Sequence, residues 1–311
     1  MAAQPESTRR AHEDGARCVD AKIAYLVSDC GVNRRFVAAG VEINTGRYQP
    51  FEVKVRDARP FQDGIRLETH GFQLFRMPSR VTDFMDRSAV DSGYAEEVAQ
   101  GVRSATGASR VVPMAWMVRT SGDLTKFERR TVGYSHQGGV QPPAAEAHVD
   151  FAPAQAHRLA QNLYEKHAPG GPGYQRFICG SFWRAFSEPP QDWPLAVCDG
   201  RSLDPEEGVT NTLVIVDSLP TPEAAVAAIP GEELLPAASV FRFNPRHRWW
   251  YFPRMTREEV LLIKFYDSDR SVAWRAPHTA FQDPSFTDAR VRFSIELRWV
   301  AFFEQLSRTG P

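Results

Sequence analysis

The chain has 311 residues, of which 42% are hydrophobic and 24% charged, so it carries enough apolar material for a sizeable globular core. Its 37 basic and 38 acidic residues give a formal net charge of -1, which excludes the broad positive field that nucleic acid or an anionic membrane requires. A small molecule is therefore the expected partner.

The cysteine pattern and the hydropathy indicate a protein of the cytoplasm. The cysteines stand at positions 18, 30, 179 and 198, with no C-x-x-C pair and too few thiols for a disulfide framework. No stretch is apolar for long enough to form a signal sequence or to cross a bilayer. We expect reduced cysteines and no export.

The chain reads as mainly β structure with a few helices. Residues 1–21, which are polar and charged, are predicted to form a disordered tail before a single catalytic domain over 22–311. Segments rich in β-type residues and bounded by turn residues predict strands at 22–27, 35–43, 51–55, 110–118 and 212–216. Helical spacing of apolar residues predicts helices at 94–104, 153–167 and 222–228, on the outside of a sheet.

Strand and helix do not alternate regularly enough for a parallel doubly wound sheet. No internal repeat is visible either. Mixed β structure with flanking helices favours a double-sheet jelly roll.

The segment AEAHVDF at 145–151 could supply two metal ligands. In a strand, alternate side chains share a face, so His148 and Asp150 point the same way. Two histidines and one carboxylate form the facial triad that holds iron(II) and leaves coordination positions open. The H-x-D spacing is weak by itself, because His12-Glu13-Asp14 also fits it, in the predicted tail.

A second histidine must come from elsewhere in the chain. His247 is disfavoured because arginines flank it on both sides, and positive charge beside a divalent cation is unfavourable. His278, in RAPHTAF, has small or apolar neighbours and follows a strand-like segment. It is the preferred candidate among His70, His136, His157, His167, His247 and His278.

The segment after residue 290 alternates almost perfectly between polar and apolar residues. Its polar face carries Arg290, Arg292, Ser294, Glu296 and Arg298. A guanidinium and a hydroxyl two residues apart, at 292 and 294, match one carboxylate of a dicarboxylate cosubstrate. The neighbouring arginines at 290 and 298 share this face, so either could be the anchor instead.

Lys264 is an unusual charge within the apolar segment LLIKFYD. It is interpreted either as a second carboxylate contact or as a residue whose ammonium reaches the edge of the sheet.

Long stretches of the chain resemble the secondary-metabolite oxygenases that include the hydroxylase component of cephalosporin 7α-methoxylase and fungal hydroxylase, desaturase and endoperoxidase relatives. The resemblance covers residues 22–303 and rests on HVDF, FWRAFSEPPQDWPLAVCD, WYFPRMTREEVLLIKFYDSD, RAPHTAFQDP and RFSIELRWVAFF. It implies a double-stranded β-helix fold with iron(II), 2-oxoglutarate and dioxygen as cofactors. It also implies iron ligands at His148, Asp150 and His278, and a 2-oxoglutarate contact at Arg292 with Ser294.

For the cephalosporin member, the resemblance implies 7α hydroxylation of the β-lactam nucleus, before methylation by a separate S-adenosylmethionine-dependent methyltransferase. Another natural product is the alternative substrate. Arg184, Arg275 and Arg298 are candidates to meet a substrate carboxylate. The stretch at about 151–277, between the two ligand segments, is expected to be an insertion that folds around the substrate.

Two other classes remain open at this point. A zinc hydrolase would also use two histidines and a carboxylate, but it would need no dicarboxylate anchor. A jelly-roll accessory subunit of a methyltransferase would have no redox chemistry of its own, and its metal residues would be dispensable.

Overall fold

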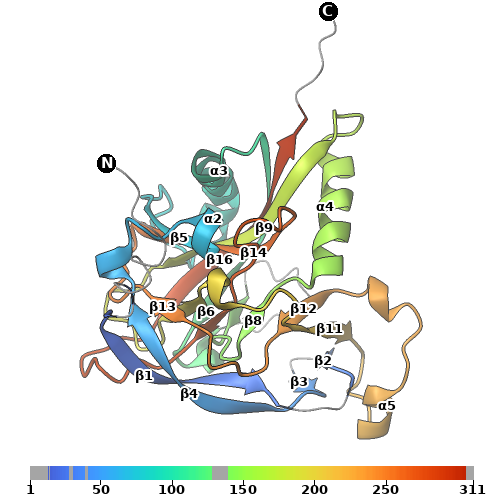
Figure 1. Ribbon diagram of the computed structural model, residues 1–311, viewed down its shortest axis with the longest axis horizontal. Helices are drawn as coiled ribbons and strands as arrows, with labels where there is room; N and C mark the ends of the chain where they lie inside the picture. The colour runs from blue at the N-terminus through green and yellow to red at the C-terminus, as the bar shows by residue number, and fades with distance from the viewer. Residues whose placement is uncertain (1–12, 14, 28–30, 39–40, 128–138, 306–311) are drawn as a thin grey trace, which may run out of the picture.

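The computed structural model describes residues 13, 15–27, 31–38, 41–127 and 139–305. Two β-sheets face each other, with helices on their outer sides (Figure 1). The larger sheet contains, in spatial order, β1 (Cys18–Leu26), β4 (Tyr48–Asp57), β13 (Trp249–Tyr251), β10 (Leu195–Cys198), β15 (His278–Ala280), β8 (His148–Val149), β12 (Ala237–Val240), β11 (Val209–Ile215), β2 (Arg34–Ala38) and β3 (Val41–Asn44).

The smaller sheet contains β5 (Phe72–Arg76), β14 (Glu259–Asp267), β9 (Tyr174–Ala185), β16 (Phe293–Glu304), β6 (Arg110–Thr120) and β7 (Val140–Gln141), also in spatial order. The helices are α2 (Leu67–His70), α3 (Arg87–Thr106), α4 (Pro153–His167) and α5 (Pro222–Val226). Figure 1 shows α4 along one side of the molecule, near β9, and α3 beside β6 and β16.

The chain crosses repeatedly between the two sheets. Strands β8, β10, β13 and β15 lie in the larger sheet, whereas β6, β9, β14 and β16 lie in the smaller one. Neighbouring strands within each of these sets of four run antiparallel. Eight strands in two facing antiparallel sheets form a jelly roll. The predicted double-stranded β-helix is therefore confirmed.

The alternation after residue 290 becomes strand β16, at the centre of the smaller sheet. Its apolar side chains Ile295, Leu297 and Trp299 pack with Tyr94 and Val98 of α3 in one buried cluster. Its opposite face, including Ser294 and Arg298, lies in the space between the two sheets. Helix α3 covers the apolar face of β16 and removes this face from water. The polar face of β16 therefore lines the space between the two sheets.

Several predicted elements differ from the structure at their edges. Strand β1 begins at Cys18, and Glu13 is only 7% exposed, so the chain is ordered before residue 22 and the predicted tail is too long. The rest of the predicted tail, His12 included, lies outside the described residues. The predicted strand at 35–43 is the antiparallel pair β2 and β3. Helix α4 has the predicted bounds, and it starts with a proline, as suits a first turn.

The stretch 151–277 is not mainly an insertion. It supplies β9, β10, β13 and β14 to the two facing sheets, so much of it is the barrel itself. The long separation between the two ligand segments follows from topology, because half of the barrel strands lie between them in the chain. Strands β11 and β12 extend the larger sheet beyond this barrel.

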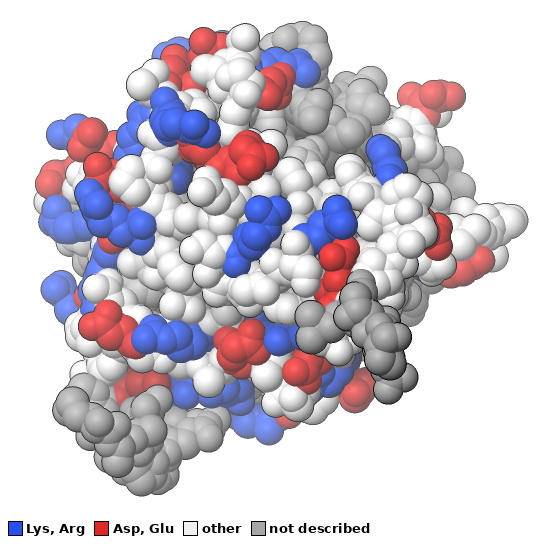
Figure 2. Space-filling view, turned by 90° about the horizontal axis from the view of Figure 1, so that it is seen from above, with Lys and Arg blue, Asp and Glu red and all other residues white. Residues whose placement is uncertain are grey.

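The surface carries charges of both signs. Figure 2 shows acidic and basic side chains interspersed on the face that it displays, around pale uncharged areas. Among the described residues, no helix is long and apolar enough to cross a membrane.

Candidate metal centre and adjoining cavities

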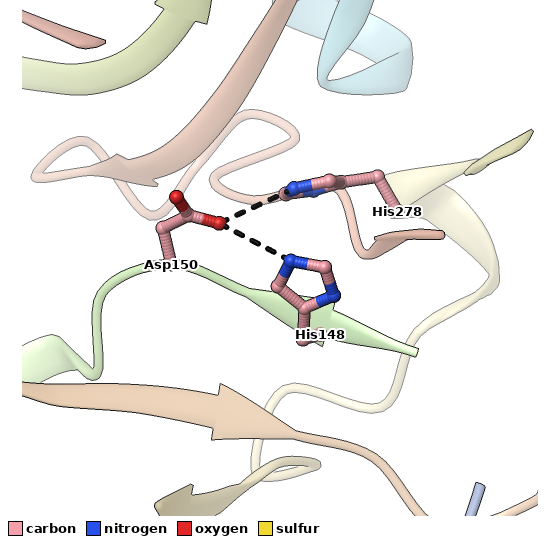
Figure 3. A group of neighbouring side chains, drawn as sticks. All are labelled: His148, Asp150 and His278. Carbon is pink, nitrogen blue, oxygen red and sulfur yellow. Dashed lines mark ion pairs between the residues drawn. The ribbon is translucent and has the colours of Figure 1, made fainter. Parts of the chain in front are cut away.

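Two neighbouring strands bring His148, Asp150 and His278 together. His148 opens β8, Asp150 follows its end, and His278 opens β15 directly opposite His148 in the strand register. Asp150 Oδ1 lies 3.4 Å from His148 Nε2 and 3.3 Å from His278 Nε2 (Figure 3). Ligands in adjacent positions around a metal, each about 2.1 Å from it, lie about 3 Å apart. Both carboxylate–imidazole distances are close to this value, and the ligand atoms of all three residues lie within 4.8 Å of one another, as a facial triad needs.

The hydrogen bond made by Nδ1 of each imidazole determines that Nε2 is the nitrogen available to a metal. Nδ1 of His148 lies 2.8 Å from the carbonyl oxygen of Glu146, and Nδ1 of His278 lies 3.4 Å from that of Ala276. A carbonyl only accepts, so these Nδ1 atoms carry the hydrogen. The Nε2 lone pairs then face Asp150, as metal coordination requires. Phe265 stacks on His278, with 5.2 Å between ring centroids, and restricts its rotation.

Arg298 contacts the other oxygen of the carboxylate. Its Nη2 lies 2.6 Å from Asp150 Oδ2 as an ion pair, although no N–H is aligned on that oxygen as a hydrogen bond. Burial by itself would raise the pKa of Asp150. The positive charge of Arg298 is the largest effect that opposes burial, and it holds this pKa well below its usual range. Asp150 is thus an anion with one oxygen left for a metal.

A small cavity beside the triad contains the predicted cosubstrate contact. Arg292, His148 and His278 all line it, together with apolar side chains such as Trp183 and Ile263. Arg292 is 1% exposed, and the Nη1 group donates to the Trp193 carbonyl at 2.8 Å.

Within the described residues, this arginine has no carboxylate partner. The buried Nε atom of Arg292 has no hydrogen-bond acceptor, and the hydroxyl of Ser294 is buried without a partner as well. Burial lowers the pKa of Arg292 to about 9, because the charge is costly away from water. A buried guanidinium and hydroxyl left unsatisfied together form a receptor for an anion. Of the two rival arginines, Arg290 is exposed and Arg298 pairs with Asp150 of the triad.

A larger cavity of about 330 Å³ opens on the other side of the triad. His148, Asp150 and Arg298 form its inner end, and its walls come from β2, β3, β6, β8, β11 and β12. Much of the wall is apolar, for example Val37, Leu124, Val140, Leu213 and Val240. Arg119 of β6 lines both cavities. The sequence prediction missed this residue, although a charge beside the apolar strand segment at 110–118 was an available signal.

The structure places Lys264 away from these cavities. The Lys264 ammonium is fully buried 2.6 Å from Asp267 Oδ2, and Glu68 lies 3.5 Å away. A β-bulge follows it in the pairing of β14 with β9. It lines neither cavity, and its charge is matched by an acidic partner, so it is a structural residue rather than a cosubstrate contact.

Arg184 and Arg275 also have other roles. Arg184 is buried on the α3 side of the smaller sheet, where it donates to the Met77 carbonyl at 2.7 Å and lies over the Phe84 ring. Arg275 donates to the Glu207 carbonyl and stacks on Trp274. Neither lines the cavities, so the predicted substrate contact at Arg184 is not brought to the site.

The remaining histidines lie elsewhere. His157 bonds with the Tyr266 hydroxyl at 2.9 Å, and His247 pairs with Glu207 at 2.9 Å. His136 lies outside the described residues. His167 ends α4.

A second group of possible ligand atoms comprises Glu13, His70 and Asp199. The Arg201 guanidinium already pairs with both carboxylates, at 2.9 and 2.6 Å. His70 Nδ1 accepts from the Arg66 backbone N–H at 3.3 Å, so Nε2 carries the hydrogen and has no lone pair for a metal. This group is an ion-pair cluster that holds Glu13 to the core.

Comparisons with known proteins identify the family of this chain. A family model described as "Oxidoreductase/YMDC permease-like domain" matches residues 27–302. The hydroxylase/desaturase efuI of Hormonema carpetanum is 31% identical over 265 residues, which cover 84% of this chain and 87% of that protein. The Fe(II)/2-oxoglutarate-dependent dioxygenase nvfI of Aspergillus novofumigatus is 31% identical over 261 residues, which cover 82% and 84%.

The solved structure of the iron and alpha-ketoglutarate-dependent endoperoxidase NvfI superposes with a TM-score of 0.72 at 26% identity, and it covers 93% of this chain and 99% of that one. None of these relatives supports a zinc hydrolase or an accessory subunit without redox chemistry. The resemblance to fungal hydroxylase, desaturase and endoperoxidase relatives that was seen in the sequence is confirmed. The chain belongs to the iron(II)- and 2-oxoglutarate-dependent oxygenases, and it is an oxidoreductase with iron(II), 2-oxoglutarate and dioxygen as cofactors.

Proposed function

We propose that His148, Asp150 and His278 hold the iron and that Arg292 with Ser294 binds the distal carboxylate of 2-oxoglutarate. The observation that carries this assignment is the buried Arg292 guanidinium without a carboxylate partner, in the small cavity that touches both histidines. An anion bound there would satisfy the Nε atom of Arg292 and the Ser294 hydroxyl together.

Iron(II) with bound 2-oxoglutarate activates dioxygen for oxidation of an unreactive C–H bond. In a hydroxylation, substrate, dioxygen and 2-oxoglutarate become alcohol, succinate and carbon dioxide, with one oxygen atom in the alcohol and one in succinate. The protein residues have other tasks. Arg298 holds Asp150 by the oxygen that faces away from the histidines, and the apolar side chains of Trp183 and Ile263 keep water out of the cosubstrate cavity.

The substrate proposed for the larger cavity is a secondary metabolite. The specific form of the proposal is 7α hydroxylation of a cephalosporin, followed by methylation by a partner methyltransferase. The cavity supports it in two respects: it reaches the triad, and its wall combines apolar surface with arginine side chains that suit a carboxylate. Hydroxylation or desaturation of another natural product is the alternative, favoured by the hydroxylase/desaturase relatives.

Anaerobic addition of iron(II) and then 2-oxoglutarate tests the cosubstrate assignment. We expect a weak visible charge-transfer band that is absent from His278→Ala and that needs much more 2-oxoglutarate in Arg292→Gln. Confirmed iron binding with no band would refute the assignment. Cephalosporin C and succinate assays in air then test the substrate: an added oxygen atom supports the specific form, and succinate formation stimulated only by other metabolites favours the alternative.

A further inference from the structure

We infer that Arg119 binds a carboxylate of the substrate, so that the substrate class is an apolar skeleton bearing an acidic group. This inference rests on the proposed function, because it places the substrate in the 330 Å³ cavity beside the triad. It adds a specificity residue to that cavity.

The position of Arg119 is the first argument. It lies near the end of β6 opposite Ser294 of β16, at the junction where the larger and the smaller cavity meet. Nη1 of Arg119 donates to the carbonyl oxygen of Pro142 at 2.8 Å. Pro142 lines the larger cavity and not the smaller one, so this bond holds the guanidinium toward the substrate side.

The charges around the larger cavity are the second argument. Arg35 pairs with Glu42 at 2.5 Å, and Arg298 pairs with Asp150 at 2.6 Å. Among the described residues, Arg119 forms no ion pair, and Pro142 is its hydrogen-bond acceptor. Among the wall residues that the structure describes, Arg119 is thus a cation without a carboxylate partner.

Glu146 is a further charged side chain of this wall. It forms no ion pair with Arg119 among the described residues, and as a carboxylate on the same wall it repels an acidic ligand group. An acidic substrate group is therefore directed to Arg119 and away from Glu146. Charge of both signs at one cavity orients a ligand in a single direction.

The guanidinium groups of Arg292 and Arg119 can then bind two different ligands. Arg292 faces the smaller cavity with a free Nε atom, and Arg119 is anchored on the wall of the larger one. Each would bind a different carboxylate: one from the cosubstrate and one from the substrate. A bidentate charge-assisted contact of this kind discriminates strongly against a neutral ester.

The test uses the enzyme loaded anaerobically with iron(II) and 2-oxoglutarate. A panel of apolar polycyclic carboxylic acids is titrated, each beside its own methyl ester, and the shift of the charge-transfer band reports occupancy next to the metal. We expect acids to bind about 10- to 100-fold more tightly than their esters. The preference should disappear in Arg119→Gln, persist in part in Arg119→Lys, and remain in Arg35→Gln, a matched control on the same wall.

The outcomes separate this inference from the proposed function. A wild-type enzyme that shows the band but no preference for acids would overturn the role of Arg119 and leave the cosubstrate site intact. Loss of 2-oxoglutarate affinity in Arg119→Gln, to the extent seen in Arg292→Gln, would also overturn it by assigning Arg119 to the cosubstrate. Absence of the band from iron-loaded wild type would refute the proposed function itself. The acid and ester comparison on the wild type needs no variant to fold.

Discussion

Replacement of Arg292 by methionine separates ligand binding from folding. The guanidinium is 1% exposed and lacks a carboxylate partner among the described residues, while Nη1 makes one bond to the Trp193 carbonyl. Loss of a neutral backbone contact costs about 1 kcal/mol, but removal of an unpaired buried charge relieves a penalty of at least similar size. The free energy of unfolding without cosubstrate should therefore change by less than about 1 kcal/mol, or increase.

The cosubstrate affinity should respond in the opposite way. Truncation of one partner of a buried, hydrogen-bonded charge pair costs about 3 to 5 kcal/mol, which weakens 2-oxoglutarate binding by about 10² to 10³-fold or more. Anaerobic titration of the iron-loaded protein measures the affinity, and urea denaturation measures the stability. Arg290→Met, an exposed arginine two residues away, is the control. Unchanged affinity, or a large loss of stability without ligand, would refute the reasoning.

Three further predictions concern the site and its support. Asp150→Asn should weaken iron(II) binding by more than about 100-fold, since it removes the anionic ligand; full iron content by metal analysis would contradict this. Lys264→Met should lower the free energy of unfolding by about 2 to 4 kcal/mol, because it leaves Asp267 without one cation, with 2-oxoglutarate affinity unchanged in the folded protein. Burial by itself would raise the pKa of Glu207. Hydrogen bonds, of which the one from His247 is the strongest, outweigh burial and lower this pKa. The stabilisation by ionised Glu207 is thus present above about pH 4.5, and it is lost as the pH falls through the pKa of Glu207 in the folded protein. The difference in Tm between wild type and Glu207→Gln should therefore shrink as the pH is lowered. A difference that stays constant would contradict this prediction.

Local patterns in the sequence were sufficient for much of the architecture. The alternation after residue 290 predicts both faces of β16, because a central strand covered by a helix must be apolar on that side. The proline at 153 and the helical spacing after it predict α4 from end to end. An H-x-D pattern in a strand places its two polar side chains on one face, independently of the tertiary structure, because alternate residues of a strand share a face. The small and apolar neighbours of His278 already favoured it as the second histidine, and the resemblance to known oxygenases added the cofactors.

The tertiary structure decided which of the charged residues share a site. Lys264 in β14 and Arg292 just before β16 are both buried cations, and their partners distinguish them. Lys264 contacts Asp267, whereas Arg292 contacts no carboxylate among the described residues. Glu13 lies in the predicted tail, but the ion pair with Arg201 holds it in a buried position. The role proposed for Arg119 depends on its position where two cavities meet. Pairing energies depend on distances between segments far apart in the chain, and local sequence patterns carry no information on those distances.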